Sequence, residues 1–415
     1  MVHWGVQHGA RGCRRVLDTR AGRHRRRLPR ARAQAICPAD HRKPLNPYIF
    51  GDSMTSTSAR PIPVVTSPEH RGHAPPVEVQ CGRPIPAFDT VARMDAIHHA
   101  LAGEPNVELI GPDVDSAVLE SIRGVHDTAL VDFLGQAWSA ADVPDDGVEL
   151  VFADTFIHPG LHAPTVAAKK PQDAGAFGQY CFDTITGIGP GTYDAAIGSV
   201  STALTAMRRV ADGAPLALAL CRPPGHHVSA DAFGGGSYLN NAAISAQSLR
   251  DSGADRVAIL DVDFHHGNGT QSIFYDRADV LYASLHGHPD RSYPYFTGYA
   301  GEAGSGHGRG STLNLPFAEA IEGPAYLALL DGALSAISKF TPDLIVVSLG
   351  FDTFRGDPGG DAALDRADYR EMGRAIADVG VPVLAILEGG YSVSELGDNV
   401  GAWLSGATNA STVGG

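Results

Sequence analysis

Titratable side chains gather in one stretch of the sequence, DVDFHHGNGT at residues 261–270. The apolar run RVAIL precedes it and is typical of a buried strand. Two aspartates and two histidines follow that run: Asp261, Asp263, His265 and His266. Buried charges are costly unless they are paired or bind a metal. Aspartate and histidine together suit a borderline divalent ion such as zinc, so we interpret the stretch as part of a metal site.

A catalytic zinc site keeps three protein ligands and leaves room for water or substrate. Asp263 and His265 would supply two of them, on the same side of the strand if the backbone stays extended. Asp352, in GFDTF, could supply the third from a different strand end. The plainer interpretation of DxDxH alone is a hydrogen-bonded strand terminus, and Asp352 makes that interpretation much less favoured.

Four further polar clusters also follow apolar runs: RPPGHH (222–227), SLHGHPD (284–290), GFDTFRGDP (350–358) and EGGYS (388–392). The runs predict buried strands at 216–221, 257–263, 280–286, 344–350 and 381–388. Ala-rich or amphipathic segments predict helices at 240–251, 324–340, 366–379 and 393–403. This alternation predicts an α/β fold, with a single open, mainly parallel sheet and helices on both faces. Ligands bind beyond the carboxyl ends of such strands, so we expect the five clusters to form one site.

The adjacent histidines His226 and His227 are candidates for acid–base catalysis. Pro-Pro-Gly before them predicts a rigid turn that aims both imidazoles at one point. Histidine titrates near neutrality and suits proton transfer to and from a metal-bound water. A buried histidine more often only packs in a core, but two in a row after this turn are harder to explain in that way. Asp261 and Asn268 are the nearest candidates to orient the two rings.

Tyr391 follows two glycines, which let the backbone come close to a ligand. Its phenol could donate a hydrogen bond to the oxyanion that forms when water attacks a carbonyl. The alternative for this residue alone is a tyrosine on a surface turn.

Composition limits the class of protein. The chain has 415 residues, of which 43% are hydrophobic and 49 are glycine, as in a globular enzyme with many tight turns. It contains no run of 18 apolar residues, so we expect no membrane span. Five scattered cysteines without a CxxC pair predict no disulfide framework and a reducing, cytoplasmic setting.

Charge divides the chain unevenly. Residues 1–50 carry a net +10, which leaves −24 on the rest, because the whole chain carries −14. The acidic body disfavours nucleic acid and favours a cationic small molecule, although acidic surfaces also simply keep proteins soluble. We predict that residues 1–53 are a disordered basic extension; a nucleic-acid arm and a transit-like peptide are the alternatives. Residues 54–415 would form the catalytic domain, with a loop insertion near 141–195 that is rich in Pro, Gly and Asp.

In this order, RPPGHH, DVDFHHGNGT, SLGFDTF and EGGY resemble the zinc-dependent histone deacetylase superfamily. LNNAA (239–243) and SLHGHP (284–289) make the chain most similar to the bacterial acetylpolyamine amidohydrolase branch. The resemblance covers roughly residues 60–410. It implies one zinc ion per chain, with the ligands Asp263, His265 and Asp352. It also implies a structural potassium ion beside the zinc, at Asp261, Asp263, His265, Ser284 and Leu285.

The resemblance also implies the roles of the remaining polar residues. His226 and His227 become the catalytic pair, and His227 is the general base. Asp261 would orient His226, and Asn268 would orient His227 from a position where one branch of the family has aspartate. Tyr391 matches the tyrosine that polarises the substrate carbonyl, whereas His266 is expected to be structural.

The substrate pocket departs from the family pattern in GGGSYLNN (234–241). Gly236, next to Gly235, stands where the family has an aromatic wall, and Tyr293 matches the opposite wall. We therefore expect a tunnel that is wider or that another loop fills. Six acidic residues of the insertion could attract a polyamine ammonium or could simply be solvated: Asp142, Asp145, Asp146, Glu149, Asp154 and Asp183. A homodimer, with this loop narrowing the entrance, is implied by the resemblance.

The leading hypothesis is a zinc-dependent amidohydrolase that removes acetyl or other acyl groups from acetylated polyamines or related small amines with a metal-activated water. The first alternative is the same reaction on protein acetyl-lysine. A ureohydrolase such as arginase shares the fold and uses two manganese ions, and a non-catalytic metal-binding regulator is a third alternative. The histidine pair and Tyr391 disfavour both of the last two.

Overall fold

The computed structural model describes residues 61–113, 117–141, 150–158 and 169–408. The predicted basic extension, residues 1–53, lies outside the described residues. So do four of the six acidic residues of the insertion, which fall within 142–149. No helix within the described ranges combines the length and the apolar character needed to cross a membrane.

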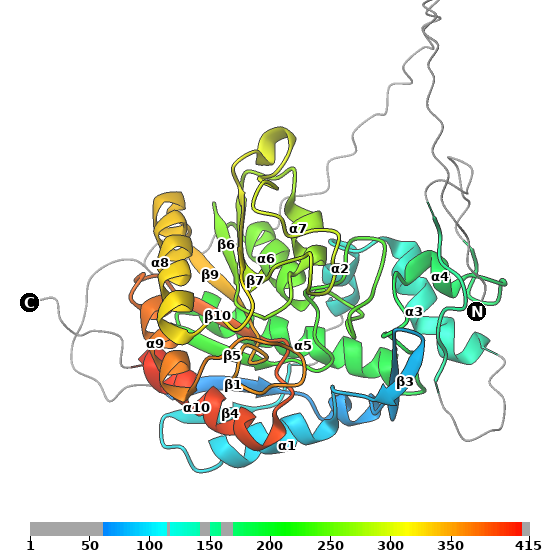
Figure 1. Ribbon diagram of the computed structural model, residues 1–415, viewed down its shortest axis with the longest axis horizontal. Helices are drawn as coiled ribbons and strands as arrows, with labels where there is room; N and C mark the ends of the chain where they lie inside the picture. The colour runs from blue at the N-terminus through cyan, green and yellow to red at the C-terminus, as the bar shows by residue number, and fades with distance from the viewer. Residues whose placement is uncertain (1–60, 114–116, 142–149, 159–168, 409–415) are drawn as a thin grey trace, which may run out of the picture. The chain divides into compact units, whose positions relative to one another are not determined.

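The described residues form one parallel sheet of eight strands, in the order β4-β1-β5-β10-β9-β6-β7-β8 (Figure 1). The strands are β1 (Ile62–Thr66), β4 (Val107–Ile110), β5 (Leu216–Leu220), β6 (Val257–Asp261), β7 (Val280–Gly287), β8 (Thr312–Phe317), β9 (Leu344–Leu349) and β10 (Val383–Leu387). Each neighbouring pair is parallel, which confirms the predicted fold class. The five strands expected from the sequence are contiguous in this order, and β1, β4 and β8 join them at the two sides. A separate antiparallel hairpin consists of β2 (Val77–Gln80) and β3 (Arg83–Pro86).

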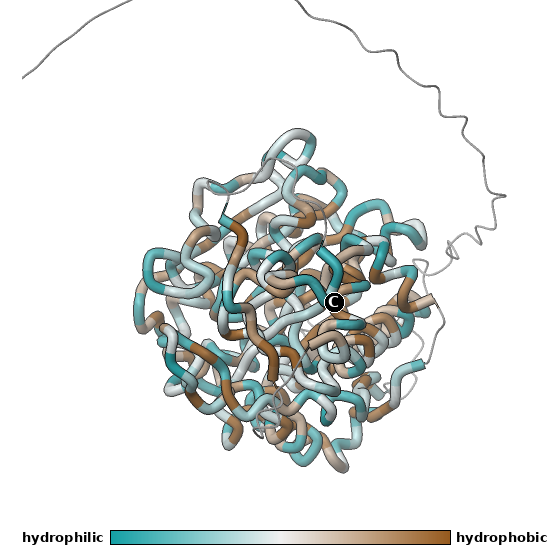
Figure 2. Tube along the Cα trace, turned by 90° about the vertical axis from the view of Figure 1, so that its right-hand side faces the viewer, coloured by the Kyte–Doolittle hydropathy of each residue, from teal (hydrophilic) through white to brown (hydrophobic). Residues whose placement is uncertain are grey.

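The central strands are buried on both faces. Every residue of β5, β6, β7, β9 and β10 is buried, as expected for continuous apolar runs in a parallel sheet. Alternate side chains enter different cores: Val257 and Ile259 of β6 pack in one cluster, and Ala258 and Leu260 in the other. Figure 2 shows the hydrophobic residues along the segments that run through the body, with hydrophilic residues on many of the outer turns.

Helices cover both sheet faces (Figure 1). One core includes residues of α2 (Val118–Arg123), α3 (Thr128–Ala140), α5 (Thr192–Ala211) and α6 (Asn241–Asp251). The other includes residues of α1 (Val91–Leu101), α8 (Gly323–Phe340), α9 (Arg366–Ala377) and α10 (Val393–Thr408). Two shorter helices are α4 (Phe177–Tyr180) and α7 (Asn268–Phe274). The predicted helices agree with α6, α8, α9 and α10 to within a few residues, except that α10 continues to Thr408.

The expected loop insertion, residues 141–195, is partly regular in its described residues. It contains α4, a bridge between Val151 and Ile188, and the first turn of α5 from Thr192 onward. Gly191, within this predicted loop insertion, makes a close packing contact. A Cβ on Gly191 would lie 2.3 Å from the backbone oxygen of Gly72. The glycine therefore marks the contact of two backbones at the start of a helix.

We predict that Gly191→Ala destabilises the fold by about 1–3 kcal/mol, because backbone atoms rather than a flexible side chain occupy the space of the new methyl group. Gly332→Ala is the matched control. Gly332 lies inside α8, and its added Cβ would meet nothing within 4 Å. That control should stabilise the protein by about 0.5–1 kcal/mol through helix propensity. Urea denaturation of both variants measures the difference, and equal midpoints would contradict the packing explanation.

Candidate active site

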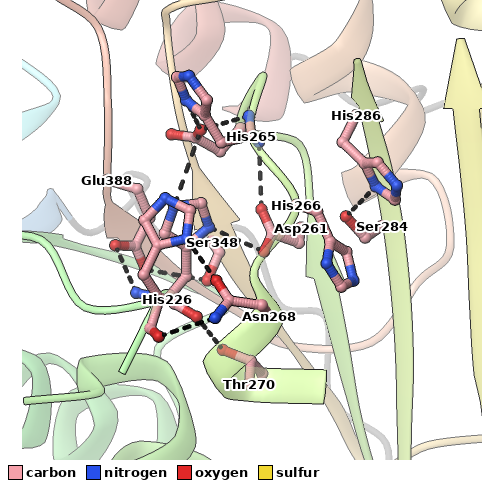
Figure 3. A network of polar contacts seen from close by, with 12 residues as sticks. His226, Asp261, His265, His266, Asn268, Thr270, Ser284, His286, Ser348 and Glu388 are labelled. Carbon is pink, nitrogen blue, oxygen red and sulfur yellow. Dashed lines mark hydrogen bonds and ion pairs between the residues drawn. The ribbon is translucent and has the colours of Figure 1, made fainter. Parts of the chain in front are cut away.

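The five polar clusters meet because their strands are neighbours. β5, β10, β9, β6 and β7 lie side by side in parallel, so their carboxyl ends share one edge of the sheet. Figure 3 shows side chains from these strand ends converging on one another, among them His226, Asp261, His265 and Glu388. The chain segments that meet here are far apart in the sequence.

Asp263, His265 and Asp352 offer ligand atoms that all lie within 4.8 Å of one another. His265 Nδ1 is 3.3 Å from Asp263 Oδ1 and 3.0 Å from Asp352 Oδ2. The expected extended conformation does not persist, since β6 ends at Asp261 and the backbone bends over residues 263–265. The three side chains come together because of this bend and because Asp352 follows the end of β9. The extended conformation in which Asp263 and His265 share one side of a strand is not the cause.

Backbone groups hold the two carboxylates in place. Gly389 N–H donates to Asp263 Oδ2 at 2.8 Å, and Phe264 N–H donates to Asp352 Oδ1 at 2.8 Å. A Cβ on Gly389 would lie 2.6 Å from the Asp263 carboxylate and 2.7 Å from that of Asp352. The first glycine of EGGY is therefore required by close approach to both acids.

The electrostatics of these three residues fit a divalent cation. Burial, and then the charge of Asp263, raise the pKa of Asp352 to about 7. Burial alone would lower the pKa of His265, but its hydrogen bonds with Asp263 and Asp352 raise that pKa to about 10. A positive charge between the two buried acids would therefore stabilise their ionised forms. A bound divalent ion would supply that charge and leave His265 as a neutral nitrogen ligand.

His226 lies against two carboxylates. Its Nδ1 is 3.1 Å from Asp261 Oδ2, and its Nε2 is 3.8 Å from Asp263 Oδ1. Tyr282 O–H donates to the same Asp261 oxygen at 3.0 Å. Burial alone would lower the pKa of His226, but Asp261 and Asp263 outweigh it and raise that pKa to about 10. His226 is therefore suited to carry a positive charge.

His227, by contrast, has an amide partner. Asn268 Oδ1 lies 2.7 Å from His227 Nδ1, and Asn268 Nδ2 donates to the His227 backbone oxygen at 3.3 Å. This amide orientation makes Nδ1 the protonated ring nitrogen and leaves a lone pair on Nε2. Burial, and then the charges of His226 and His265, lower the pKa of His227 well below its usual value. The ring centroids of His226 and His227 are 4.0 Å apart, so an acid and a base lie side by side.

Glu388 is a buried part of the site that sequence reasoning missed. Its Oε2 accepts hydrogen bonds from Gly225 N at 2.7 Å and His226 N at 3.2 Å, and its Oε1 accepts one from Ser348 Oγ at 3.0 Å. Burial raises the pKa of Glu388 to about 7. The carboxyl holds the Pro-Pro-Gly turn in place. A glutamate directly after the apolar run of β10 was the available signal.

Two fully buried arginines, Arg93 and Arg222, share Asp89, a contact that no sequence pattern indicated. Asp89 Oδ1 accepts from Arg93 Nη1 at 2.7 Å and from Arg222 Nε at 2.9 Å. Arg93 also donates to the backbone oxygens of Glu388 and Gly390, both at 2.6 Å. Burial would raise the pKa of Asp89, but the two arginines lower it to about 2. The trio ties the EGGY segment to RPPG.

Tyr391 is positioned through its backbone and its ring. Its N–H donates to Asp357 Oδ2 at 2.7 Å, and Gly390 before it has φ of +115°, a conformation that favours glycine. The Arg93 guanidinium lies 4.9 Å from the centre of the Tyr391 ring. Burial raises the pKa of the Tyr391 phenol well above its usual value, although Arg93 acts in the opposite direction. The phenol therefore stays a hydrogen-bond donor.

Three of the five predicted potassium ligands, Asp261, Ser284 and Leu285, lie on the adjacent strands β6 and β7, and the other two follow the end of β6. Ser284 of β7 pairs with Asp261 of β6, and its Oγ is 2.8 Å from His286 Nδ1. His266 lies near Ser284 and His286 (Figure 3). Its Nε2 is 3.1 Å from Gln271 Oε1, and its ring centroid is 4.6 Å from that of His286. His266 therefore packs in a buried polar cluster away from the three candidate ligands.

Two of the three predicted pocket residues, Tyr293 and Gly235, contact His227. The Tyr293 ring is 4.9 Å from the His227 ring and nearly perpendicular to it, at 88°. A Cβ on Gly235 would lie 2.2 Å from His227 Cδ2, so this glycine packs directly on the imidazole. A Cβ on Gly236 would meet nothing within 4 Å.

We predict that Asp89→Ala lowers the free energy of unfolding by about 3–5 kcal/mol, because it leaves Arg93 and Arg222 buried without their shared carboxylate. Asp95→Ala is the control, since Asp95 pairs with Arg71 where both side chains are more than half exposed. That change should cost less than about 1 kcal/mol. Chemical denaturation followed by circular dichroism measures both, and a similar small loss for the two variants would contradict the prediction.

Comparison with known proteins gives a consistent result. The histone deacetylase domain family matches residues 88–407. Acetylpolyamine amidohydrolase 1 of Pseudomonas aeruginosa is 43% identical over 83% of this chain and 99% of its own. The Mycoplana ramosa acetylpolyamine amidohydrolase is 41% identical over 83% of this chain and 98% of its own. A crystal structure of acetylpolyamine aminohydrolase from Burkholderia pseudomallei is 35% identical and superposes with a TM-score of 0.78, covering 84% of this chain and 99% of that one.

Proposed function

The chain belongs to the histone deacetylase family, and from this we propose that it removes acetyl groups from acetylated polyamines and related small amines. It is a hydrolase that acts on amide bonds. The observation that carries the choice of substrate is the similarity to acetylpolyamine amidohydrolases, at 40–43% identity over at least 95% of their length. Removal of acetyl groups from protein lysines is the alternative, supported by 41% identity to histone deacetylase 15 of Arabidopsis thaliana over 43% of this chain.

We propose that Asp263, His265 and Asp352 hold one zinc ion per chain. One imidazole and two carboxylates are an accepted zinc donor set, and the two acids face each other in a buried place where a cation is needed. When bound, zinc polarises a carbonyl oxygen and lowers the pKa of a coordinated water. Gly389 leaves the space in which the carboxylates can converge.

In this proposal the residues of the chain divide the proton transfers. His227 takes the proton of the attacking water at Nε2, because Asn268 keeps the other proton on Nδ1. His226, held by Asp261, keeps a positive charge beside the developing negative charge. Tyr391 donates its phenol hydrogen to the oxyanion, and the proton on His227 then passes to the departing amine. Gly235 lets the backbone pack directly on the ring of His227, the proposed base.

Three further expectations stay predictions. A potassium ion would be bound by oxygens of Asp261, Asp263, His265, Ser284 and Leu285, as the family resemblance implies. A homodimer is expected from the same resemblance. The cytoplasmic location rests on the scattered cysteines.

A turnover panel tests the substrate. We expect the purified protein, loaded with zinc, to hydrolyse N-acetylputrescine and N-acetylcadaverine with a higher kcat/KM than acetyl-lysine peptides. Metal content is measured alongside by mass spectrometry, with one zinc expected per chain. Turnover of acetyl-lysine peptides alone would contradict the polyamine proposal and favour a protein lysine deacetylase. Two manganese ions per chain together with hydrolysis of arginine would favour a ureohydrolase.

Substitution of the proposed catalytic residues tests the mechanism. His227→Ala should lower kcat by about 10²–10⁴-fold, the usual contribution of a positioned acid–base group. Tyr391→Phe should lower kcat by about 10²–10³-fold through loss of an oxyanion donor. Zinc content should remain at the wild-type value in both variants, which separates catalysis from metal binding. Undiminished hydrolysis in either variant would contradict its assigned role.

A further inference from the structure

A second aromatic ring faces Tyr293 beside the catalytic pair. Phe182, in the segment between α4 and α5, is stacked with Tyr293 at a centroid distance of 6.4 Å and an angle of 19° between the ring planes. Tyr293 in turn meets the His227 ring edge to face. Phe182 is 36% exposed, so its ring lies at the solvent side of this arrangement.

The glycines of residues 234–236 leave room for the Phe182 ring. A Cβ on Gly234 would lie 2.4 Å from Phe182 Cζ, so the ring rests directly on the backbone there. Gly236 has φ of +68° and open space around its Cβ position. The family's aromatic wall is thus missing at residue 236, and Phe182 from the inserted segment packs on Gly234, two residues earlier.

Asp183 couples Phe182 to Tyr293. Its Oδ2 accepts from the Tyr293 hydroxyl at 2.7 Å and from Gly235 N at 2.6 Å. Its Oδ1 accepts from the backbone N–H groups of Ile185 and Thr186, both at 3.1 Å. This carboxylate therefore holds three segments together, which fits neither alternative raised for the acidic residues of the insertion, attraction of a substrate ammonium or simple solvation.

We propose that Phe182 is a specificity-determining residue that forms, with Tyr293, a slot for an unbranched alkyl chain next to the scissile amide. This inference rests on the proposed function. A methylene chain between two rings needs about 3.5–4.0 Å on each side, or roughly 7–8 Å in all. The ring centroids are 6.4 Å apart, so the partly exposed Phe182 moves outward to admit the chain, whereas Tyr293 is fixed by its hydroxyl. A ring or branch close to the amide nitrogen does not fit.

The test compares a linear with a branched acetamide in wild type and Phe182→Ala. The linear substrate is N-acetylputrescine, or another linear acetylated amine that the wild type hydrolyses. The branched substrate is N-(cyclohexylmethyl)acetamide. We expect Phe182→Ala to raise KM for the linear substrate about tenfold and to change kcat less than about threefold. The preference for the linear substrate, as a ratio of kcat/KM values, should fall about tenfold or more. A purely structural role for Phe182 would lower kcat for both substrates and leave this ratio unchanged.

Two further variants complete the design. Gly234→Ala keeps Phe182 but displaces its ring, so its substrate preference should fall in the same direction. Phe296→Ala is the control, because that ring is 90% exposed on the segment that carries Tyr293, and its preference should equal that of wild type. An unchanged preference in Phe182→Ala and Gly234→Ala, with an active wild type, overturns the slot alone. A wild type that hydrolyses no acetylated amine overturns the proposed function and the slot with it.

Discussion

The cost of buried negative charge is the constraint on which this structure depends. Asp261, Asp263, Asp352 and Glu388 are at most 1% exposed at the carboxyl ends of three neighbouring strands. Four such carboxylates would repel one another and would be poorly solvated. Three features of the surrounding chain offset this negative charge. Backbone N–H groups donate to the carboxylates, His226 carries a positive charge, and three ligand atoms are arranged to suit a cation. Each of these acids has a hydrogen-bond donor or a positive charge beside it.

The two adjacent histidines have different pKa values because their hydrogen-bond partners differ in charge: a carboxylate for His226 and a neutral amide for His227. His226 and His227 share a turn and are both nearly inaccessible to solvent. A carboxylate beside the first raises its pKa, whereas the amide of Asn268 offers the second a hydrogen bond without a full charge. The charge on the first then further disfavours protonation of the second. The difference between aspartate and asparagine is thus passed on to the acid–base character of the pair.

Much of this arrangement was predictable because it depends on short, local sequence patterns. Continuous apolar runs predicted the five central strands, and the polar clusters behind them predicted which side chains would meet at the sheet edge. The family resemblance then paired His226 with Asp261 and His227 with Asn268. Contacts between residues far apart in the sequence have no such local pattern. Arg93 looks like one polar residue of helix α1, and its contact with Glu388 spans 295 positions in the sequence. The short strands β1, β4 and β8 and the start of α5 at a Gly-Pro-Gly sequence were also hidden, because tertiary packing decides them.

The contacts of Arg93 have a consequence for the order in which the protein is made. Arg93 belongs to α1, the first α-helix of the described residues, and its acceptors, the backbone oxygens of Glu388 and Gly390, are synthesised almost 300 residues later. A ribosome that elongates at about 5–20 residues per second needs roughly 15–60 seconds to cover that interval. During this time the arginine has no strand β10 to hold, and the glycine that backs both proposed metal ligands has not been made. The proposed site can therefore be complete only when translation of the domain is nearly finished.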